Sequence, residues 1–235
     1  MSKMFQAIFA LLILISGIIW SFSGTRPQAD LKNEVPVDQF STARAFGHVA
    51  ALAREPHYVG SAAHSRARNY IVDELEKLGL LVEMQEAYSL NELGTLVRPQ
   101  NILARIEGKT NNPALLLMSH YDSAMHSSPG ASDAASGVAT ILEGIRAYLA
   151  TGQIPENDII LLFTDAEELG LNGADLFTKD HPWAQEVGLA LNFESRGSGG
   201  NSFMLLETNG GNEALIRHFS KAGVEHPVTN SLAYS

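Results

Sequence analysis

Continuous apolar runs alternate with segments of helical periodicity along most of the chain. The runs are ALLLMSH at 114–120, DIILLFTD at 158–165 and LALNFES at 189–195. Because their apolar residues do not alternate with polar ones, they predict strands buried on both faces of a sheet. ASGVATILEGIRAYLA at 135–150 repeats its apolar positions with the period of a helix. This alternation predicts an α/β sandwich around a mixed, mostly parallel sheet.

Two amphipathic helices are predicted before the first of these runs. One follows Ser41, which suits an N-cap, and the other runs from His64 to a C-terminal cap at Gly79. Three more strands and one more helix are expected from the pattern. The strands are LVEMQEAYSL (81–90), QNILARIEG (100–108) and SFMLLET (202–208), and the helix is NEALIRHFSKAG (212–223).

The N-terminal segment is apolar and uncharged from Met4 to Trp20, after one early charge at Lys3. About 17 apolar residues is the lower limit for a membrane-spanning helix, and tryptophan suits the membrane interface. A signal anchor and a signal peptide cleaved after Ser23 both fit residues 1–23, and we favour the anchor. We expect a membrane-anchored protein whose domain lies on the extracytoplasmic side, or is exported if the segment is cleaved.

The chain that follows divides into a linker and one domain. Residues 24–40 lack periodicity and contain two prolines, so they predict a linker. Residues 41–235 are expected to form a single domain, because their number is typical of one.

The net charge and the cysteine content limit which partners and which metal ligands the protein can have. The formal net charge of -10 argues against nucleic acid as a partner. Since the chain has no cysteine, it can form neither a disulfide framework nor a thiolate metal site. Any metal must be held by histidine, aspartate and glutamate side chains.

Candidate ligands stand where the apolar runs end. His120 closes the first run, Glu167 and Glu168 follow the second, and Glu194 lies near the end of the third. Asp133 comes directly before the helix predicted at 135–150. Because ligands in such sheets gather outside the carboxyl ends of the strands, we expect these side chains to converge.

A set of histidine and carboxylate ligands without sulfur suits zinc. Asp133, at a helix start, could bridge two metal ions about 3.5–4 Å apart. Asp122, two residues after His120, could accept the second imidazole N–H and orient the ring. Glu168 could ligate metal while Glu167 acts as general base, because adjacent positions in an extended backbone point different ways.

Each of these residues also has an ordinary structural interpretation. A serine hydrolase is disfavoured because no GxSxG motif occurs, and GSGGN at 197–201 lacks the lysine and spacing of a phosphate loop. Four candidate positions that each stand beside an apolar run are better explained by one shared site than by four independent structural roles. The interpretations left open are a helix N-cap for Asp133, a hydrogen-bonded strand-end histidine for His120, first-turn helix acids for Glu167 and Glu168, and an ion pair with Arg196 for Glu194.

Four motifs carry a resemblance to a known family. SHYDS (119–123), GASDAASGVATILE (130–143), FTDAEELGLNGADLF (163–177) and LNFESRGSGG (191–200) resemble the successive motifs of the co-catalytic di-zinc aminopeptidases. That family includes secreted bacterial aminopeptidases, glutamate carboxypeptidase and membrane-bound metallopeptidases of the endoplasmic reticulum and vacuole. The resemblance covers about 41–235, is closest to the membrane-anchored branch near its end, and implies a three-layer zinc-exopeptidase sandwich with helices on both faces.

The resemblance also implies a mechanism with two Zn²⁺ ions. The metal pair would activate water, polarise the scissile carbonyl of a peptide substrate and anchor its free amino terminus. The implied roles are zinc ligands for His120 and Glu194, a bridge between the two ions for Asp133, a ligand of the second ion for Glu168, general base for Glu167, and orientation of His120 for Asp122.

One ligand of the family pattern is missing. The second zinc would take a further histidine from a motif downstream of SLAYS at 231–235. His218 and His226 do not stand in that motif and are interpreted as surface histidines. We therefore expect a domain that is incomplete at its C-terminus and whose activity in this form is uncertain.

The function expected from these observations is that of a membrane-anchored or exported zinc metallopeptidase, and within that class we favour an aminopeptidase. A di-zinc carboxypeptidase or amidohydrolase remains an alternative, because the pocket walls that set substrate polarity are not readable from the sequence. A non-catalytic ectodomain with a peptidase fold is the second alternative.

Overall fold

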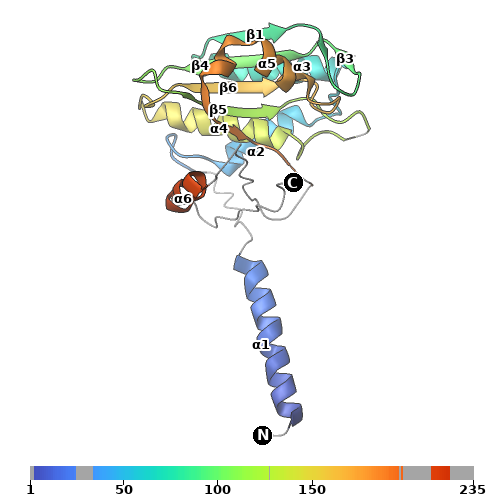
Figure 1. Ribbon diagram of the computed structural model, residues 1–235, viewed down its shortest axis with the longest axis vertical. Helices are drawn as coiled ribbons and strands as arrows, with labels where there is room; N and C mark the ends of the chain where they lie inside the picture. The colour runs from blue at the N-terminus through green and yellow to red at the C-terminus, as the bar shows by residue number, and fades with distance from the viewer. Residues whose placement is uncertain (1–2, 25–33, 127, 196, 198–212, 223–235) are drawn as a thin grey trace. The chain divides into compact units, whose positions relative to one another are not determined.

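The computed structural model describes residues 3–24, 34–126, 128–195, 197 and 213–222. The chain divides into two units, one of Met1–Ala29 with Gly199–Ser235 and one of Asp30–Ser198. The second unit contains the sheet and all the candidate site residues (Figure 1).

A five-stranded sheet forms the centre of the second unit, in the order β1-β4-β6-β5-β7. Its strands are β1 (Val82–Glu86), β4 (Gln100–Ile106), β5 (Ala114–His120), β6 (Ile159–Thr164) and β7 (Val187–Asn192). Strand β5 is parallel to both β6 and β7, and β4 is antiparallel to both β1 and β6. Four strands, β1, β5, β6 and β7, therefore run in the same direction, and β4 runs in the opposite direction. The sheet is mixed and mostly parallel, as the sequence predicts.

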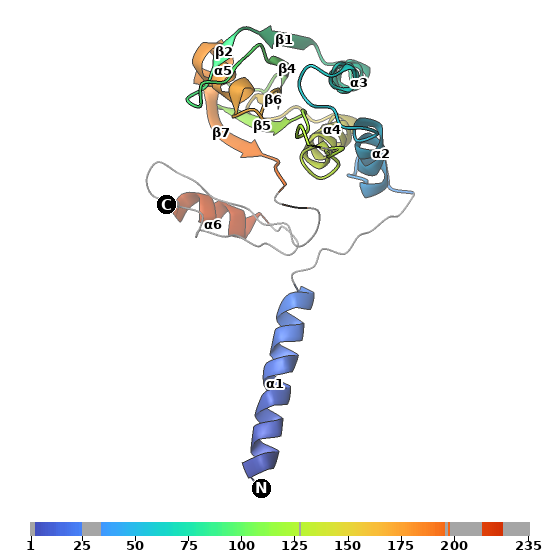
Figure 2. The same ribbon diagram turned by 90° about the vertical axis from the view of Figure 1, so that its right-hand side faces the viewer.

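Helices cover both faces of this sheet. One side carries α2 (Thr42–Leu52), α3 (Ala62–Lys77) and α4 (Ala135–Ala150), and the other carries α5 (Asn172–Asp180) with the short helix η1 (Pro182–Glu186). Figure 2 shows the sheet nearly on edge between α4 and α5. The expected three-layer sandwich is confirmed.

An apolar core lies on each face of the sheet, and strand β6 contributes residues to both. All of its residues are buried. Leu161 and Phe163 pack in the core on the α4 side, whereas Ile160 and Leu162 pack with Phe177 of α5. Because successive strand residues point to opposite faces, a run without polar alternation is what a strand covered on both sides requires.

The predicted helix starts and stops are close to those in the structure. Ser41 caps α2 by accepting a hydrogen bond from the Arg44 N–H at 3.3 Å. Helix α3 begins before His64, because the Ser61 hydroxyl caps it by accepting from the His64 N–H. Gly79 follows α3 with φ +80°, a conformation that favours glycine.

Two strand predictions need correction. The run at 81–90 forms two strands, β1 and the short β2 (Ser89–Leu90), and β2 pairs with β3 (Leu96–Val97) in a separate hairpin. Strand β7 is not buried on both faces, since its residues are half-buried or exposed. It pairs with β5 alone among the described strands, and an edge strand has fewer neighbours to cover it. The strand predicted at 202–208 lies outside the described residues.

The described residues of the first unit, 3–24 and 213–222, form two helices. Helix α1 (Lys3–Gly24) includes the span from Lys3 to Ser23, which contains an 18-residue window with a mean hydropathy of 2.2 and is long and apolar enough to cross a membrane. Its 22 residues correspond to about 33 Å, close to the thickness of a bilayer core. Helix α6 (Glu213–Lys221) lies where a helix was predicted.

The segment before α2 is held against the domain by an ion-pair network around the buried Glu143. Glu143 of α4 accepts hydrogen bonds from the Ser41 N–H at 2.8 Å, from Arg44 at 3.0 Å and from Arg146 at 2.6 Å. The two guanidinium groups also donate to carbonyl oxygens of residues 35–39. Residues 34–40 contain no helix or strand. They are held in place by these hydrogen bonds from Arg44 of α2 and Arg146 of α4.

This network predicts a pH-dependent contribution to stability. Burial by itself would raise the pKa of Glu143, but hydrogen bonds from Arg146, Ser41 and Arg44 lower it below its ordinary value. The stabilisation is complete above the unfolded pKa of about 4.3 and is lost as pH falls through the lower folded pKa. In urea titrations from pH 7 to pH 3, the wild type should therefore lose more stability below about pH 4.3 than Glu143→Gln. Parallel pH profiles would contradict this assignment.

Candidate metal and catalytic site

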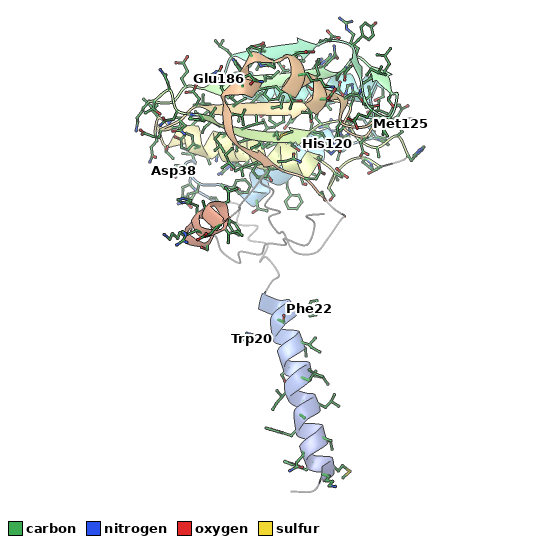
Figure 3. The ribbon with its side chains drawn as sticks, viewed as in Figure 1. Trp20, Phe22, Asp38, His120, Met125 and Glu186 are labelled. Atoms are coloured by element: carbon green, nitrogen blue, oxygen red, sulfur yellow. The ribbon has the colours of Figure 1, made fainter. Side chains whose placement is uncertain are left out.

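The candidate residues meet at one edge of the sheet. His120 ends β5, the turn with Glu167 and Glu168 follows β6, and Glu194 lies two residues beyond β7. Because these three strands are parallel, their carboxyl ends share an edge. Asp133 reaches the same place from the loop before α4, and Figure 3 labels His120 at this edge.

His120, Asp133 and Glu194 form a compact group whose ligand atoms all lie within 4.8 Å of one another. His120 Nε2 is 2.8 Å from Asp133 Oδ1 and 3.7 Å from Glu194 Oε1. Zinc ligands about 2.0–2.2 Å from the metal are about 3.3 Å apart in a tetrahedral site, which lies between these two distances. The group therefore fits a zinc ion in both donor chemistry and spacing.

The group is closed on one side and open on the other. The His120 side chain is 1 % exposed, whereas the side chains of Asp133 and Glu194 are 46 % and 34 % exposed. A metal held by these residues would thus face solvent on the carboxylate side, as a catalytic rather than a closed structural site requires.

Charge is concentrated around the imidazole. Burial alone would lower the pKa of His120, but the carboxylates of Asp122 and Glu194 raise it to about 11. Burial raises the pKa of Asp133, although its hydrogen bond with His120 opposes the change. The pKa of Glu194 is lowered, because the nearby His120 imidazole and the hydrogen bond from the Ser195 N–H outweigh burial. Several carboxylates around one imidazole form a charge pattern that a divalent cation neutralises.

Asp122 connects His120 to the glutamate turn. His120 Nδ1 is 3.0 Å from the Asp122 carbonyl oxygen and 3.4 Å from its carboxylate. The two carboxylate oxygens accept hydrogen bonds from the Glu167 N–H at 3.0 Å and the Glu168 N–H at 3.2 Å. The nearest acceptor for the ring is thus the Asp122 carbonyl, while its fully buried carboxylate holds the turn.

Glu167 and Glu168 lie in a turn that ends before α5 begins, so they are not first-turn helix acids. The Glu167 carbonyl closes the turn by accepting from the N–H groups of Gly170 and Leu171. Burial raises the pKa of Glu167, which favours its use as a proton acceptor nearer neutral pH. Burial and the nearby Asp133 also raise the pKa of Glu168.

Two other structural interpretations can be compared with the geometry. The N-cap of α4 is Ala134, with no side-chain capping bond, and Asp133 instead contacts His120. Arg196, the suggested partner of Glu194, lies outside the described residues. The Glu194 carboxylate accepts from the Ser195 N–H at 2.8 Å.

A close approach at Gly137 brings the elements of the site together. A Cβ atom there would lie 2.4 Å from both the Phe193 carbonyl oxygen and the Ser119 hydroxyl. Only glycine lets α4 pack this closely against the ends of β5 and β7. The packing sets Asp133 beside His120 and Glu194.

Sequence reasoning missed two asparagines that hold the glutamate turn, the buried Asn101 and the half-buried Asn91. Asn101 accepts from the Asp165 N–H and donates to the Gly173 carbonyl, and Asn91 donates to the carbonyls of Leu169 and Gly170. An asparagine at the start of the apolar strand β4 was an available signal, since asparagine is depleted in strands.

An α/β sandwich with imidazole and carboxylate ligands at the carboxyl edge of its parallel strands defines the zinc-exopeptidase fold class. Residues 101–234, more than half of the chain, match the family described as Peptidase family M28. The chain belongs to peptidase family M28, and the resemblance drawn from its motifs is confirmed.

Individual relatives agree with this membership. A "Vacuolar membrane protease" of Candida tropicalis is 32% identical over 191 residues, which cover 77% of this chain and 20% of that protein. A Porphyromonas gingivalis glutaminyl cyclase superposes with a TM-score of 0.63 at 25% identity, covering 72% of this chain and 64% of that one. A Zn-dependent exopeptidase from Parabacteroides distasonis gives 0.59 at 25% identity, covering 72% and 66%. The chain spans about a fifth of the length of the curated relatives that it matches.

Proposed function

We propose that this chain carries the catalytic centre of a membrane-anchored, zinc-dependent exopeptidase that removes residues from the amino terminus of peptides. The observation that carries the proposal is the convergence of His120, Asp133 and Glu194 within 4.8 Å, beside the turn of Glu167 and Glu168.

In this proposal His120, Asp133 and Glu194 hold one zinc ion, and Asp133 with Glu168 contributes to a second. Zinc at such a site polarises a carbonyl as a Lewis acid and lowers the pKa of water. Glu167 takes the proton of the attacking water and returns it to the leaving amine. Its half-buried position and raised pKa suit a group that must both accept and release a proton.

The charge of the site favours a substrate with a free amino group. Five carboxylates carry five negative charges, and two zinc ions would carry four positive ones. The remaining negative charge attracts an ammonium group and repels the carboxylate that a carboxypeptidase must bind. The carboxylates are those of Asp122, Asp133, Glu167, Glu168 and Glu194.

The membrane part of the proposal rests on α1. We propose that residues 1–23 anchor the protein and that 24–40 link the anchor to an extracytoplasmic domain. The length and composition of α1 support an anchor, and the curated relative from Candida tropicalis is called a membrane protease.

The test compares free and blocked substrates on the zinc-loaded protein. Aminoacyl-nitroanilides should be cleaved, N-acetylated analogues should resist, and a chelator should abolish turnover. Cleavage of only the blocked substrates, or of peptides from the carboxyl end, would exclude an aminopeptidase. Peptides with N-terminal glutamine are tested as well, because a glutaminyl cyclase shares the fold. If they yield a pyroglutamyl product and no peptide bond is hydrolysed, the protein is a cyclase and the peptidase proposal is wrong.

A further inference from the structure

Behind the glutamate turn lies a buried pair, His64 of α3 and Asp165, with 2.8 Å between His64 Nε2 and Asp165 Oδ1. Neither residue belongs to the group around His120. We propose that His64 and Asp165 are positioning residues that hold the turn so that Glu167 faces the reacting water. The inference rests on the proposed function, since it assigns Glu167 the role of base.

Asp165 is surrounded by hydrogen-bond donors. Its Oδ1 accepts from His64 and from the Ala166 N–H at 2.7 Å, and its Oδ2 accepts from the Gln100 N–H at 2.8 Å. The residue is 1 % exposed. Because each neighbour donates, the position requires a carboxylate: an amide would turn its NH₂ group toward one of these donors.

His64 ties the pair to the strand that carries the metal ligand. Its ring stacks on Tyr121 with 5.0 Å between the ring centroids, and Tyr121 directly follows His120. The Tyr121 hydroxyl donates to the Gln100 carbonyl at 2.9 Å, and its N–H donates to the Thr164 carbonyl at 3.0 Å. The same network thus contacts the ends of β5 and β6 and the start of β4.

The backbone between Asp165 and Glu167 needs such support. Ala166 is fully buried and has φ 57°, a left-handed conformation that is unfavourable for a residue other than glycine. Asp165 holds the Ala166 N–H on one side, and Asp122 holds the N–H groups of Glu167 and Glu168 on the other. Two buried carboxylates therefore fix the direction in which Glu167 leaves the strand.

The test uses variants of His64, chosen by whether the new side chain can donate a hydrogen bond to Asp165. His64→Leu removes the donor and leaves the ring space filled, whereas His64→Gln keeps an N–H group that can face Asp165. His181→Leu is the matched control, because His181 is also buried but bonds to Glu83 and Trp183 on the side of α5 and η1.

Two measurements test the proposal. Hydrogen exchange should accelerate in peptides containing 161–173 for His64→Leu, but not for His181→Leu, and this readout needs no activity. Turnover should fall about 10- to 100-fold in kcat with KM within about threefold, because a misplaced catalytic group costs about this much. His64→Gln should recover most of the loss, and zinc stoichiometry should stay that of the wild type.

The proposal is overturned if His64→Leu folds and keeps wild-type exchange in 161–173, or if its exchange rises uniformly as in a merely destabilised protein. If His64→Leu does not fold, Asp165→Asn is judged by the same criteria. On a Glu167→Gln background, His64→Leu should lower residual kcat no further, and multiplying effects would contradict the assigned role. Full turnover of Glu167→Gln alone would instead refute the proposed function and leave the exchange result interpretable.

Discussion

Replacement of Glu167 by glutamine is expected to lower turnover by about 10²- to 10⁴-fold, the usual contribution of a positioned general base. Glutamine keeps the size of the side chain but cannot accept a proton at neutral pH. The backbone bond from residue 167 to Asp122 is unaffected by this change, so the turn should persist. Zinc content should stay close to that of the wild type, because Glu167 is assigned to the attacking water and not to a metal ion.

Glu168→Gln is the matched control, since the two glutamates share one turn and both backbone N–H groups bond to Asp122. It should lower bound zinc as well as turnover, because Glu168 is assigned as a ligand. Metal content by mass spectrometry and kcat on an aminoacyl-nitroanilide separate the two effects. An equal loss of zinc in both variants would show that the division of roles between Glu167 and Glu168 is wrong.

Loss of Asp122 is expected to affect metal, turn and stability together. In Asp122→Ala the N–H groups of Glu167 and Glu168 lose their acceptors inside the protein, at about 1–3 kcal/mol for each unsatisfied group. His120 also loses the carboxylate 3.4 Å from its Nδ1, and such outer partners typically change metal affinity by about 10- to 100-fold.

Isothermal titration with zinc and thermal unfolding measure these two effects. Asp175→Ala is the control, because Asp175 pairs with the exposed Lys179 on α5 and such surface pairs contribute little to stability. Wild-type zinc affinity in a folded Asp122→Ala protein would mean that the backbone carbonyl alone orients His120.

The residues that hold the site in place are spread along the chain more widely than the proposed metal ligands. His64 comes from α3 and Asn101 from β4, yet both bond to Asp165 at the start of the glutamate turn. Substitutions more than 60 residues from Glu167 in sequence should therefore act on this proposed general base.

Several features of the fold could be predicted because they depend on neighbours in sequence. Ser41 caps α2 through a residue three positions away, and Gly79 ends α3 through its own backbone freedom. The burial of β7 was predicted wrongly from the same kind of pattern. An apolar run shows that its residues can be buried, but whether they are buried depends on how many strands and helices pack beside the run.

By itself, the sequence determined the order of the five sheet strands and of helices α2, α3, α4 and α6, but it predicted neither α5 nor the hairpin of β2 and β3. It also placed His120, Glu167, Glu168 and Glu194 after apolar runs. These follow from local periodicity and from the rule that parallel strands share a carboxyl edge. The tertiary structure alone decided the spacing within the group of His120, Asp133 and Glu194, and the bonds by which Asp122 and the His64–Asp165 pair hold the turn. Such contacts join residues up to about 100 positions apart, and their geometry depends on packing, such as the approach at Gly137, that no local pattern records.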